Sequence, residues 1–517
     1  MKRSLTIGIT VLALCAAFLY PGCTCDDDDD DNDTGDDDDN DDNDDDDTLD
    51  DDDDDDDLTD DDDDLFDPNS PSDDYGVFAA TYGDDGNPGT MAAPLRTVQA
   101  AVDLAAKTGK VAFVAMGEYV ENVNATASLY GGYRNYTWDR DPALYPTRLA
   151  SPGAIALSIE NQNAEASLIV EGLQIEGGKT GEDSCGLRVR RSRAIVRRCT
   201  MRSASVSGEY IAQTIGVAVD QYSVVELRDN LIVAGAIECA GYCLASRAQS
   251  IAVYSEKSDL TMVGNRAISR PASQQAYAAT GIGLSVYRGR IHLSYNEFYA
   301  TADPTSSLSG VTAVTVEDCP NALLVGNRLH AFASLGSQAL RVSNKLIRAA
   351  SSVTAINNLL HASGTIDTGG VAAVFGAMDL RLIDNIFELP AMSDATAGLY
   401  IAAELATPSV TVRNNNFDTK TSALIFIGAT AVADVDELDA CTWTGCADAG
   451  DNLATAAGLT GLYDAHLTDG SPCIDAGIDP TPWYDGPEIF YDFEGDARPA
   501  GDGWDIGMDE YVATRQP

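Results

Sequence analysis

Clustered carboxylates near the carboxyl terminus are the first residues of this chain whose types and spacing could do chemistry. Five aspartates alternate there with glycines: Asp492, Asp496, Asp502, Asp505 and Asp509. Carboxylate oxygens are the ligands that Ca²⁺ prefers, so the last four are candidate Ca²⁺ ligands. The competing interpretation, which we favour, is Asp-Gly turn chemistry in a closing segment. The sequence therefore requires no cofactor and suggests Ca²⁺ as the candidate cation.

Arginines form the only strongly basic stretch of an otherwise acidic chain. This candidate anionic-ligand patch consists of Arg188, Arg190, Arg191, Arg193, Arg197 and Arg198. Arg188 and Arg190 alternate with Leu187 and Val189, which predicts that both arginines lie on an outward strand face. Guanidinium forks suit carboxylates and sulfates, so an anionic polysaccharide and the chain's own aspartate tract are both candidate ligands. The interpretation that we favour is a solvated outer face.

A recurring asparagine identifies the elements that must position these groups. Its seven copies are separated by 35, 31, 31, 31, 27 and 30 residues: Asn230, Asn265, Asn296, Asn327, Asn358, Asn385 and Asn415. Apolar residues tend to lie five and three positions before each asparagine and two positions after it, as Leu380, Leu382 and Phe387 do around Asn385. A spacing of two is typical of a β-strand. Cys199 and Leu173 hold the same position in two earlier units.

Each repeating unit is too short to bury its own apolar face, so the units must stack on one another. No long helical periodicity lies between them, which predicts a parallel β-helix of about nine coils. Asparagine amides both donate and accept, so at a strand spacing of ~4.8 Å they can form a hydrogen-bonded ladder at a turn. Asparagine also tolerates the left-handed backbone that such a turn needs. We therefore interpret the asparagines as structural and expect any site on the loops or outer faces.

The exposed strand edges at both ends of a β-helix need covering. Residues 97–107 fit a short amphipathic helix, because Val98, Ala101, Val102 and Ala105 share one face and Gly109 follows as a stop signal. This helix is predicted to cap the first coils. Four aromatic residues around a Gly-Gly turn are predicted to pack the same cap rather than to bind sugars: Tyr130, Tyr133, Tyr136 and Trp138.

Both ends of the chain resemble a known family. The runs GDDGNPGT from Gly83, PLRTVQAA from Pro94 and VAMGEY from Val114 are similar to the opening of bacterial surface proteins of the pectate-lyase-like right-handed β-helix superfamily, many of which begin with a domain of unknown function. The runs SPCIDAG from Ser471, DARP from Asp496 and DIGMDEY from Asp505 resemble their closing segment. The resemblance spans residues 75–511 and implies an all-β, right-handed parallel β-helix with an N-terminal capping helix.

The resemblance implies no particular activity, because the superfamily includes lyases, hydrolases, epimerases and adhesins. Its pectate lyases hold Ca²⁺ with acidic residues and use an Arg or Lys as base, and its polygalacturonase-like hydrolases use paired aspartates with a nearby His. The ordered Asn-Thr-Asp, Asp-Asp and Gly-His-Gly series is absent from this sequence, so we assign no catalytic residue. His330 and His361 each follow a ladder asparagine by three residues, which predicts surface rings stacked on adjacent coils rather than a catalytic pair.

The amino terminus predicts export. Met1-Lys-Arg followed by an apolar run over residues 5–20 is typical of a secretory signal. Cys23 then lies where bacterial lipoproteins are acylated, although Tyr20 and Pro21 depart from the usual residues, so ordinary cleavage is the alternative. Residues 26–64 include 30 aspartates, which leaves −21 of the formal charge of −51 for the rest of the chain. Such a tract lacks core-forming residues and repels itself, which predicts a disordered linker.

Eight cysteines follow the linker: Cys185, Cys199, Cys239, Cys243, Cys319, Cys441, Cys446 and Cys473. An even number in an exported chain permits disulfides, and Cys239/Cys243 and Cys441/Cys446 are the nearest local pairs. Zinc is disfavoured, because neither pair has a matching partner pair at finger spacing and the chain has only four histidines.

We therefore expect a signal peptide at 1–22, an Asp-rich tether at 23–74, a cap with the first coils at 75–145, β-helix repeats at 146–430 and a closing segment at 431–517. The expected protein is exported to the outer membrane or cell surface of a Gram-negative bacterium and held there by a lipid anchor on Cys23. Its expected role is non-catalytic glycan binding, or a structural or adhesive one. The alternative is a polysaccharide lyase or glycoside hydrolase acting on an acidic polysaccharide. The aspartate tract disfavours nucleic acid as a partner, and the oligomeric state stays open.

Overall fold

The computed structural model of the protein describes residues 66–513, apart from 162–165, 182, 208–211, 239–247, 271–278, 303–309, 345–350, 366–368, 377, 390–395, 403–407, 420–422 and 462–463. The expectations for the signal peptide, for Cys23 and for most of the tether lie outside the described residues. So do Cys239 and Cys243. No helix in the described part of the chain is long and apolar enough to cross a membrane.

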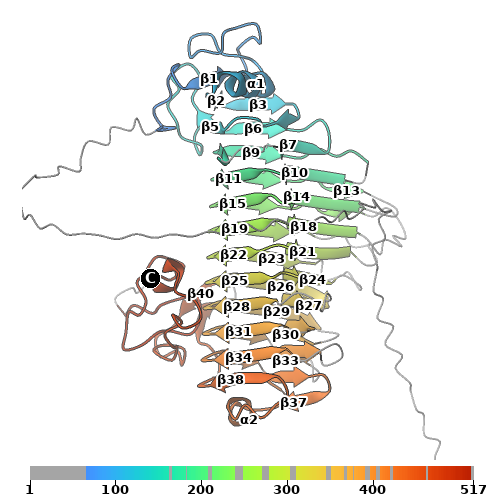
Figure 1. Ribbon diagram of the computed structural model, residues 1–517, viewed down its shortest axis with the longest axis vertical. Coiled ribbons are helices and arrows are strands. Elements are labelled where there is room, and N and C mark those ends of the chain that lie inside the picture. Colours follow the sequence, from blue (N-terminus) through green and yellow to red (C-terminus); the bar gives the residue numbers. More distant parts are fainter. Residues whose placement is uncertain are drawn as a thin grey trace, which may run out of the picture. The chain divides into compact units, whose positions relative to one another are not determined.

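Three long sheets of stacked, almost entirely parallel strands build the folded unit, and each coil contributes one strand to each sheet (Figure 1). Sheet A comprises β1 (Gly76–Ala79), β2 (Val111–Ala115), β5 (Leu129–Tyr133), β8 (Leu168–Glu171), β11 (Arg193–Arg197), β15 (Val224–Arg228), β19 (Asp259–Val263), β22 (Ile291–Ser294), β25 (Asn321–Val325), β28 (Ser352–Ile356), β31 (Asp379–Ile383), β34 (Ser409–Arg413) and β38 (Cys446–Gly450). Sheet B comprises β3 (Gly117–Val120), β6 (Thr147–Ala150), β9 (Leu173–Glu176), β12 (Thr200–Arg202), β16 (Leu231–Val233), β20 (Arg266–Ser269), β23 (Glu297–Thr301), β26 (Arg328–Leu335), β29 (Leu359–Thr365), β32 (Ile386–Leu389) and β35 (Asn416–Thr419).

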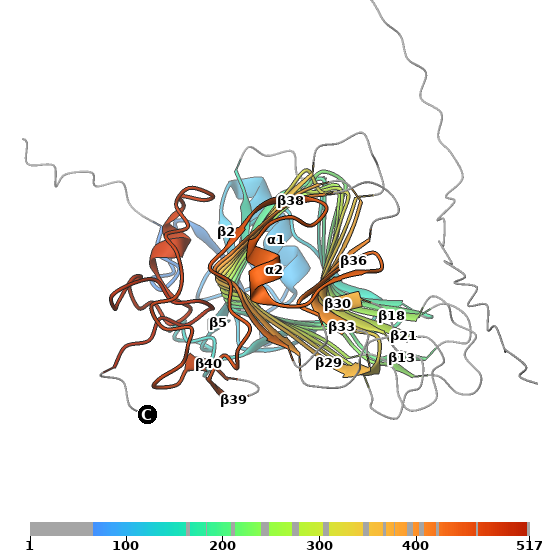
Figure 2. The same cartoon turned by 90° about the horizontal axis from the view of Figure 1, so that it is seen from below.

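Sheet C comprises β4 (Val123–Asn124), β7 (Ile155–Glu160), β10 (Asp183–Arg190), β14 (Ala212–Asp220), β18 (Ala248–Glu256), β21 (Ala279–Tyr287), β24 (Val311–Glu317), β27 (Ser337–Ser343), β30 (Gly369–Phe375), β33 (Thr396–Ala402), β36 (Ile425–Ile427) and the antiparallel β37 (Thr430–Val432). The remaining elements are the pair β13 (Val206–Ser207) and β17 (Ile237–Glu238), the hairpin β39 (Leu459–Gly461) and β40 (Asp464–Leu467), the helices α1 (Val98–Thr108) and α2 (Val435–Asp439), and the 3₁₀ turn η1 (Pro487–Phe490). Viewed along the stack, the three sheets surround one interior (Figure 2). The predicted right-handed parallel β-helix of about nine coils with an N-terminal capping helix is confirmed.

Alternation along each strand sends apolar side chains into this interior. In β31, Leu380 and Leu382 are fully buried, whereas Arg381 between them faces outward. Two positions after the ladder asparagines of the last coils, Phe387 and Phe417 stack inside sheet B with ring centroids 4.8 Å apart. Burial of one such side chain stabilises the fold by about 1.5–3 kcal/mol, so stacking supplies the core that a single coil lacks.

The asparagines form a continuous hydrogen-bonded column at the turn from sheet A to sheet B. At a representative rung, Oδ1 of Asn327 accepts from the backbone N–H of Asn296 at 2.9 Å and from its Nδ2 at 3.0 Å. Nδ2 of Asn327 donates to the carbonyl oxygen of Leu293 on the previous coil at 2.8 Å. The same bonds join Asn230 to Asn265, Asn265 to Asn296, Asn327 to Asn358, Asn358 to Asn385, Asn385 to Asn415 and Asn415 to Asn452.

The column extends past the seven asparagines in both directions. The backbone N–H of Cys199 donates to Oδ1 of Asn230 at 2.9 Å, and the register of sheet B puts Leu173 in the same column. Asn452 adds a rung that the sequence period misses, because 37 residues separate it from Asn415. This longer interval contains α2 and the loop that follows it.

The left-handed backbone of the turn lies one residue earlier than we expect from the sequence. Tyr295 and Asn357, the residues before two ladder asparagines, have φ values of 56° and 54°. Gly264 and Gly326 hold the same place in other coils, with φ values of 66° and 61°. The ladder position is thus selected for its amide hydrogen bonds, and the preceding residue adopts the strained backbone.

Helix α1 covers the open end of the first coils, as predicted. Thr97 Oγ1 accepts from the backbone N–H of Ala100 at 3.2 Å, and Gly109 ends the helix with φ 67°. The Glu121 carboxylate accepts from the first two N–H groups of the helix at 2.9 and 3.0 Å. These contacts satisfy donors that have no partner within the helix and place a negative charge at its positive end.

Aromatic side chains from the first coils form a cluster separate from the core that α1 covers. The buried cluster consists of Phe78, Phe113, Tyr130, Tyr133 and Trp138. Tyr133 donates its hydroxyl to the Pro68 carbonyl at 2.6 Å, and the Trp138 indole donates to the Met91 carbonyl at 3.2 Å. Tyr136 departs from the prediction, because it is 74% exposed and stacks on Tyr82 with ring centroids 4.3 Å apart.

The carboxyl-terminal part has two roles in the fold. Helix α2 and β38, joined by the Cys441–Cys446 disulfide, close the last coil (Figures 1 and 2). The described part of residues 458–513, which we call the return segment, then runs back along the outside of the ladder turns. Asp384 accepts there from the Ile478 N–H at 3.0 Å, and Asn357 Nδ2 donates to the Asp505 carbonyl at 3.2 Å. The return segment therefore covers the turns of several coils.

Candidate functional site

The outer face of sheet C carries two columns of mostly polar and aromatic side chains, interrupted by three alanines. The register of the parallel strands aligns them coil by coil. One column contains Ser158, Arg188, Ala218, Tyr254, Ser285, Thr315, Arg341, Ala373 and Tyr400. The other contains Glu160, Arg190, Asp220, Glu256, Tyr287, Glu317, Ser343, Phe375 and Ala402. We call the two columns together the outer strip.

Asp220 lies at the most highly charged point of the outer strip. Its carboxylate oxygens lie 3.9 Å from Arg188 Nε and 3.6 Å from Arg190 Nε. Burial raises the pKa of Asp220, the two guanidiniums oppose this, and the negative charges of Glu160 and Glu256 add to it. Carboxylates and guanidiniums therefore alternate over the first three coils of the strip, at Glu160, Arg190 and Asp220.

Aromatic rings accompany these charges towards the later coils. Tyr254 donates its hydroxyl to Glu256 at 2.9 Å. Arg341 lies over the Phe375 ring at 4.7 Å from the centroid, and burial lowers the pKa of its guanidinium. Phe375 in turn lies 6.2 Å from the Tyr400 ring. Rings and charged groups on one open face can contact both the apolar faces and the hydroxyl groups of sugars.

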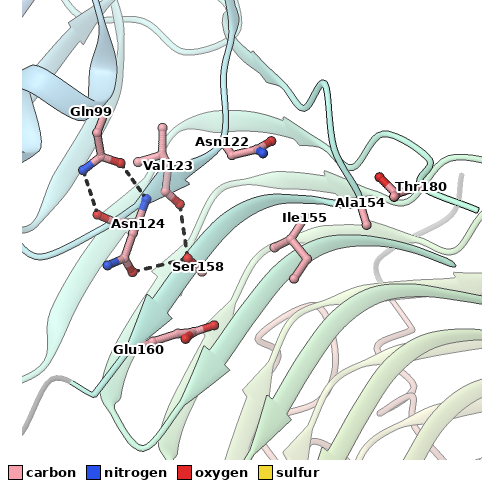
Figure 3. A pocket seen from close by; sticks show the side chains of 9 residues that line it. All are labelled: Gln99, Asn122, Val123, Asn124, Ala154, Ile155, Ser158, Glu160 and Thr180. Atoms are coloured by element: carbon pink, nitrogen blue, oxygen red, sulfur yellow. Dashed lines mark hydrogen bonds between the residues drawn. The ribbon is translucent and has the colours of Figure 1, made fainter.

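A hollow of about 440 Å³ lies at the amino-terminal end of the outer strip (Figure 3). It is lined by Gln99, Asn122, Val123, Asn124, Ala154, Ile155, Ser158, Glu160 and Thr180. Gln99 and Asn124 exchange hydrogen bonds at 2.8 and 3.2 Å, and Ser158 contacts Asn124 Oδ1 at 3.3 Å. Because Ser158 and Glu160 begin the two columns, the hollow continues the strip. Its amides, hydroxyls and carboxylate offer both donors and acceptors to a polar ligand.

The structure divides the predicted arginine patch between two faces. Arg188 and Arg190 belong to the outer strip. Arg193 and Arg197 lie on sheet A, where Arg197 Nε contacts Glu171 at 2.6 Å, and Arg198 approaches the same carboxylate to 3.6 Å. Arg191 is at the intervening turn, with φ 47°. The six residues therefore make no single surface, and an anionic-ligand role stays a prediction.

Backbone groups occupy the candidate Ca²⁺ ligands of the return segment. Buried Asp505 accepts from the N–H groups of Asp475 and Tyr511 at 2.7 and 2.6 Å. Asp509 accepts from the Leu467 N–H at 2.7 Å. No group of three or more potential metal ligands occurs among the described residues. Ca²⁺ binding here stays a prediction, and the observed bonds are those of turns.

The histidines lie away from the outer strip. His330 and His361 stack as predicted, with ring centroids 4.4 Å apart and planes 2° apart. They are buried rather than on the surface, however, with 2% and 1% of their area exposed. Nδ1 of His361 lies 2.7 Å from Glu388 on the next coil. The sequence could not show this burial, because it depends on what covers the outer face of sheet B.

Comparison with known proteins finds only distant structural similarities. No protein-family model and no curated protein sequence matches this chain. Pectate lyase Pel9A is similar in structure, with a TM-score of 0.42 and 12% identity over 86% of this chain and 98% of that one. The tailspike protein 2 of an Escherichia coli O157:H7 bacteriophage has a TM-score of 0.37 and 12% identity, over 64% of this chain and 44% of that one. A rhamnogalacturonan lyase has a TM-score of 0.27 and 11% identity, over 75% of this chain and 91% of that one.

The three stacked parallel sheets make the chain a parallel β-helix, and a pectate lyase is among the solved structures that resemble it. Similarities this distant do not indicate a ligand or an activity for this chain.

Proposed function

We propose that this protein binds a polysaccharide along the outer strip without cleaving it. The observation that supports the proposal is the repetition of the site. Successive coils present equivalent positions at a spacing of ~4.8 Å, so an extended polymer on the strip meets a row of similar contacts. Many weak contacts in a row give appreciable affinity without a deep pocket.

Charge and chemistry support a sugar ligand with some acidic groups. Arg188 and Arg190 can each turn from Asp220 towards a carboxylate or sulfate. Glu160, Glu256 and the amides of the hollow can bind sugar hydroxyls. Since the strip carries acids as well as arginines, its ligand is a polymer with spaced charges rather than a uniformly charged polyanion.

Arginine replacement tests the binding. The double variant Arg188→Ala/Arg190→Ala should bind acidic polysaccharides at least about tenfold more weakly in affinity electrophoresis, because charge-assisted contacts contribute roughly 1.5–3 kcal/mol each. Arg290→Ala is the matched control, since Arg290 is 70% exposed and belongs to the region before β22. Equal affinity of the double variant and the control would refute the strip as the binding surface.

Cleavage is the second candidate function, and the environment of Asp220 supports it. Acid–base catalysis favours a carboxyl group whose pKa is raised beside a second carboxylate, and Asp220 neighbours Glu256 on the next coil. Incubation with acidic and neutral polysaccharides, with and without Ca²⁺, should release neither unsaturated nor reducing ends. Release that Asp220→Asn abolishes would replace the binding proposal with a lyase or hydrolase.

We further propose export and attachment to the outer membrane or cell surface through acylated Cys23. The signal-like residues 1–22 and the aspartate tract support this, since a self-repelling tether can hold a binding domain away from a membrane. Mass spectrometry of the mature amino-terminal peptide should find a diacyl or triacyl group on Cys23. The Cys23→Ala variant should leave the membrane fraction, and its retention there would contradict lipid anchoring.

A further inference from the structure

A second hollow, of about 390 Å³, lies on the outer face of sheet B, a different sheet from the outer strip. It spans three coils and is lined by Arg266, Ile268, Glu297, Tyr299, Thr301 and Arg328. The lining comes from β20, β23 and β26, whose register puts Arg266, Glu297 and Arg328 in one column. Tyr299 belongs to the neighbouring column, so the hollow has charged groups along one side and an aromatic ring on the other.

Arg328 is an unusual residue to find here, because only 8% of its side chain is exposed. Its Nη1 contacts the Tyr299 hydroxyl at 3.4 Å and a Glu297 oxygen at 3.6 Å. Its buried Nε has no hydrogen-bond partner among the described residues. A guanidinium offers five N–H donors, and leaving buried donors unused is costly. The hollow thus contains a buried guanidinium whose N–H donors are not all used in hydrogen bonds.

The balance of charge in the hollow is positive. Arg266 and Arg328 share the single carboxylate of Glu297, at 3.3 and 3.6 Å. Arg266 also lies over the Tyr299 ring, 5.0 Å from its centroid, which holds the guanidinium at the rim. In a chain with a formal charge of −51, two guanidiniums around one carboxylate form a local site for an anion.

His330, the next residue along the Tyr299 column, does not add charge to the hollow. Burial lowers the pKa of His330 to about 3, and electrostatic interactions with neighbouring His361 and Arg328 act in the same direction. The imidazole is therefore neutral at neutral pH. The positive charge of the hollow comes from its arginines and is independent of pH between about 5 and 8, well above this pKa and below that of arginine.

We propose that this hollow is a second binding site, specific for a carboxylate or sulfate group carried by a sugar. The geometry supports an oxyanion seated between the guanidiniums of Arg266 and Arg328, which both line the hollow. The hydroxyls of Tyr299 and Thr301 lie at the same hollow as further hydrogen-bonding groups, and Ile268 offers an apolar contact for the sugar ring. The site lies on another sheet from the outer strip, so it gives the protein two separate binding faces.

Binding of small sugars to the full-length protein tests the proposal. Isothermal titration with glucuronate and with glucose 6-sulfate should detect binding, and the two arms distinguish a carboxylate from a sulfate ligand. Glucose should not bind. Arg328→Gln should weaken the affinity for the preferred anion at least about tenfold, the effect expected for losing a charge-assisted donor. Arg290→Gln, an exposed arginine outside both hollows, should leave it unchanged.

Because Arg328 is buried, Arg266→Gln provides a second variant that does not depend on core packing, as the Arg266 side chain is 57% exposed. It should weaken the same interaction at least about threefold, since an exposed guanidinium contributes less. The outer-strip variant Arg188→Ala/Arg190→Ala should keep full affinity for the small anion, which separates this site from the proposed polysaccharide surface. Equal affinity for glucose and glucuronate, or unchanged affinity in both hollow variants, would overturn the proposal.

Discussion

At the scale of single residues, the ladder shows why asparagine rather than another small polar residue recurs. One amide accepts two hydrogen bonds from the previous rung and donates to the next rung and to a carbonyl one coil back. A hydroxyl has a single donor and cannot reproduce this pattern. Each ladder amide is also fully or almost fully buried, so a missing partner would be costly.

Asn327→Ala should therefore destabilise the folded unit strongly. The change removes the acceptor of two Asn296 donors and leaves the Leu293 carbonyl without its bond. With about 1 kcal/mol for each lost bond and more for buried unpaired groups, the free energy of unfolding should fall by roughly 3 kcal/mol in urea titrations. Asn321→Ala, on the exposed start of β25, should change it by less than about 0.5 kcal/mol. If the two variants lost similar amounts of unfolding free energy, a stabilising role of the asparagine ladder would be contradicted.

At the scale of elements, the two ends of the β-helix are stabilised by different means. Helix α1 covers the first coil with one apolar face, whereas α2 closes the last coil and the return segment folds back over the turns. The cap depends on a side chain from outside the helix, because Glu121 binds its first N–H groups.

Replacing Glu121 with Gln should loosen the amino-terminal cap. The amide keeps one acceptor oxygen but loses the charge that interacts with the positive helix end, so we expect a loss of about 1–2 kcal/mol in thermal or chemical unfolding. Glu118→Gln is a matched control, because the Glu118–Arg148 pair at 2.9 Å is exposed and should contribute less than about 1 kcal/mol. A larger effect at Glu118 would show that the cap is not held by Glu121.

The return segment should be less stable at neutral than at mildly acidic pH. Burial raises the pKa of Glu510 to about 7, from the 4.5 of an unperturbed group, although Arg498 opposes the shift. The folded state then binds the proton more tightly than the unfolded state, so stability present below about pH 4.5 is lost as the pH rises towards 7. Burial acts likewise on Asp509, whose pKa rises to about 6.

Hydrogen exchange measured by mass spectrometry can follow this loss. After correction for the intrinsic pH dependence of exchange, peptides from the return segment should open more readily at pH 7 than at pH 5. Glu510→Gln, which cannot ionise, should reduce that difference, while peptides from β28 and β31 should show none. If the return segment opened more readily as the pH falls, the raised pKa of Glu510 would be contradicted.

At the scale of the whole molecule, charge is distributed very unevenly. The aspartate tract of residues 26–64 holds 30 of the negative charges, whereas both candidate binding faces contain guanidiniums. A polyanion in the same chain can compete electrostatically with an anionic ligand for such faces. Screening shortens the range of this competition from about 10 Å at 0.1 M salt to about 3 Å at 1 M.

Deleting residues 26–64 should therefore raise the affinity for an acidic polysaccharide severalfold at 20 mM salt. The difference should vanish near 0.5 M salt, where screening removes the competition. The unfolding temperature of the β-helix should be unchanged, because the deleted residues have no core-forming character. A fall in affinity on deletion would show instead that the tract helps to hold the ligand.

The sequence by itself determined the architecture of this protein. Period-two apolar positions around a recurring asparagine specify parallel coils, because every coil must bury the same face against its neighbours. The capping helix could be predicted equally well, because Thr97, the apolar face and Gly109 are local signals. Even the stacking of His330 on His361 followed from their common place in the repeat.

The tertiary structure alone decided which side chains meet. The arginine stretch looked continuous, yet the turn at Arg191 sends its members to two sheets, because each strand of a coil faces a different direction. Asp220 joins Arg188 only through the register of neighbouring coils, and the burial of Arg328 depends on what packs outside sheet B. A repeat fixes positions along one coil, but partners one coil away depend on loop lengths that periodicity does not specify.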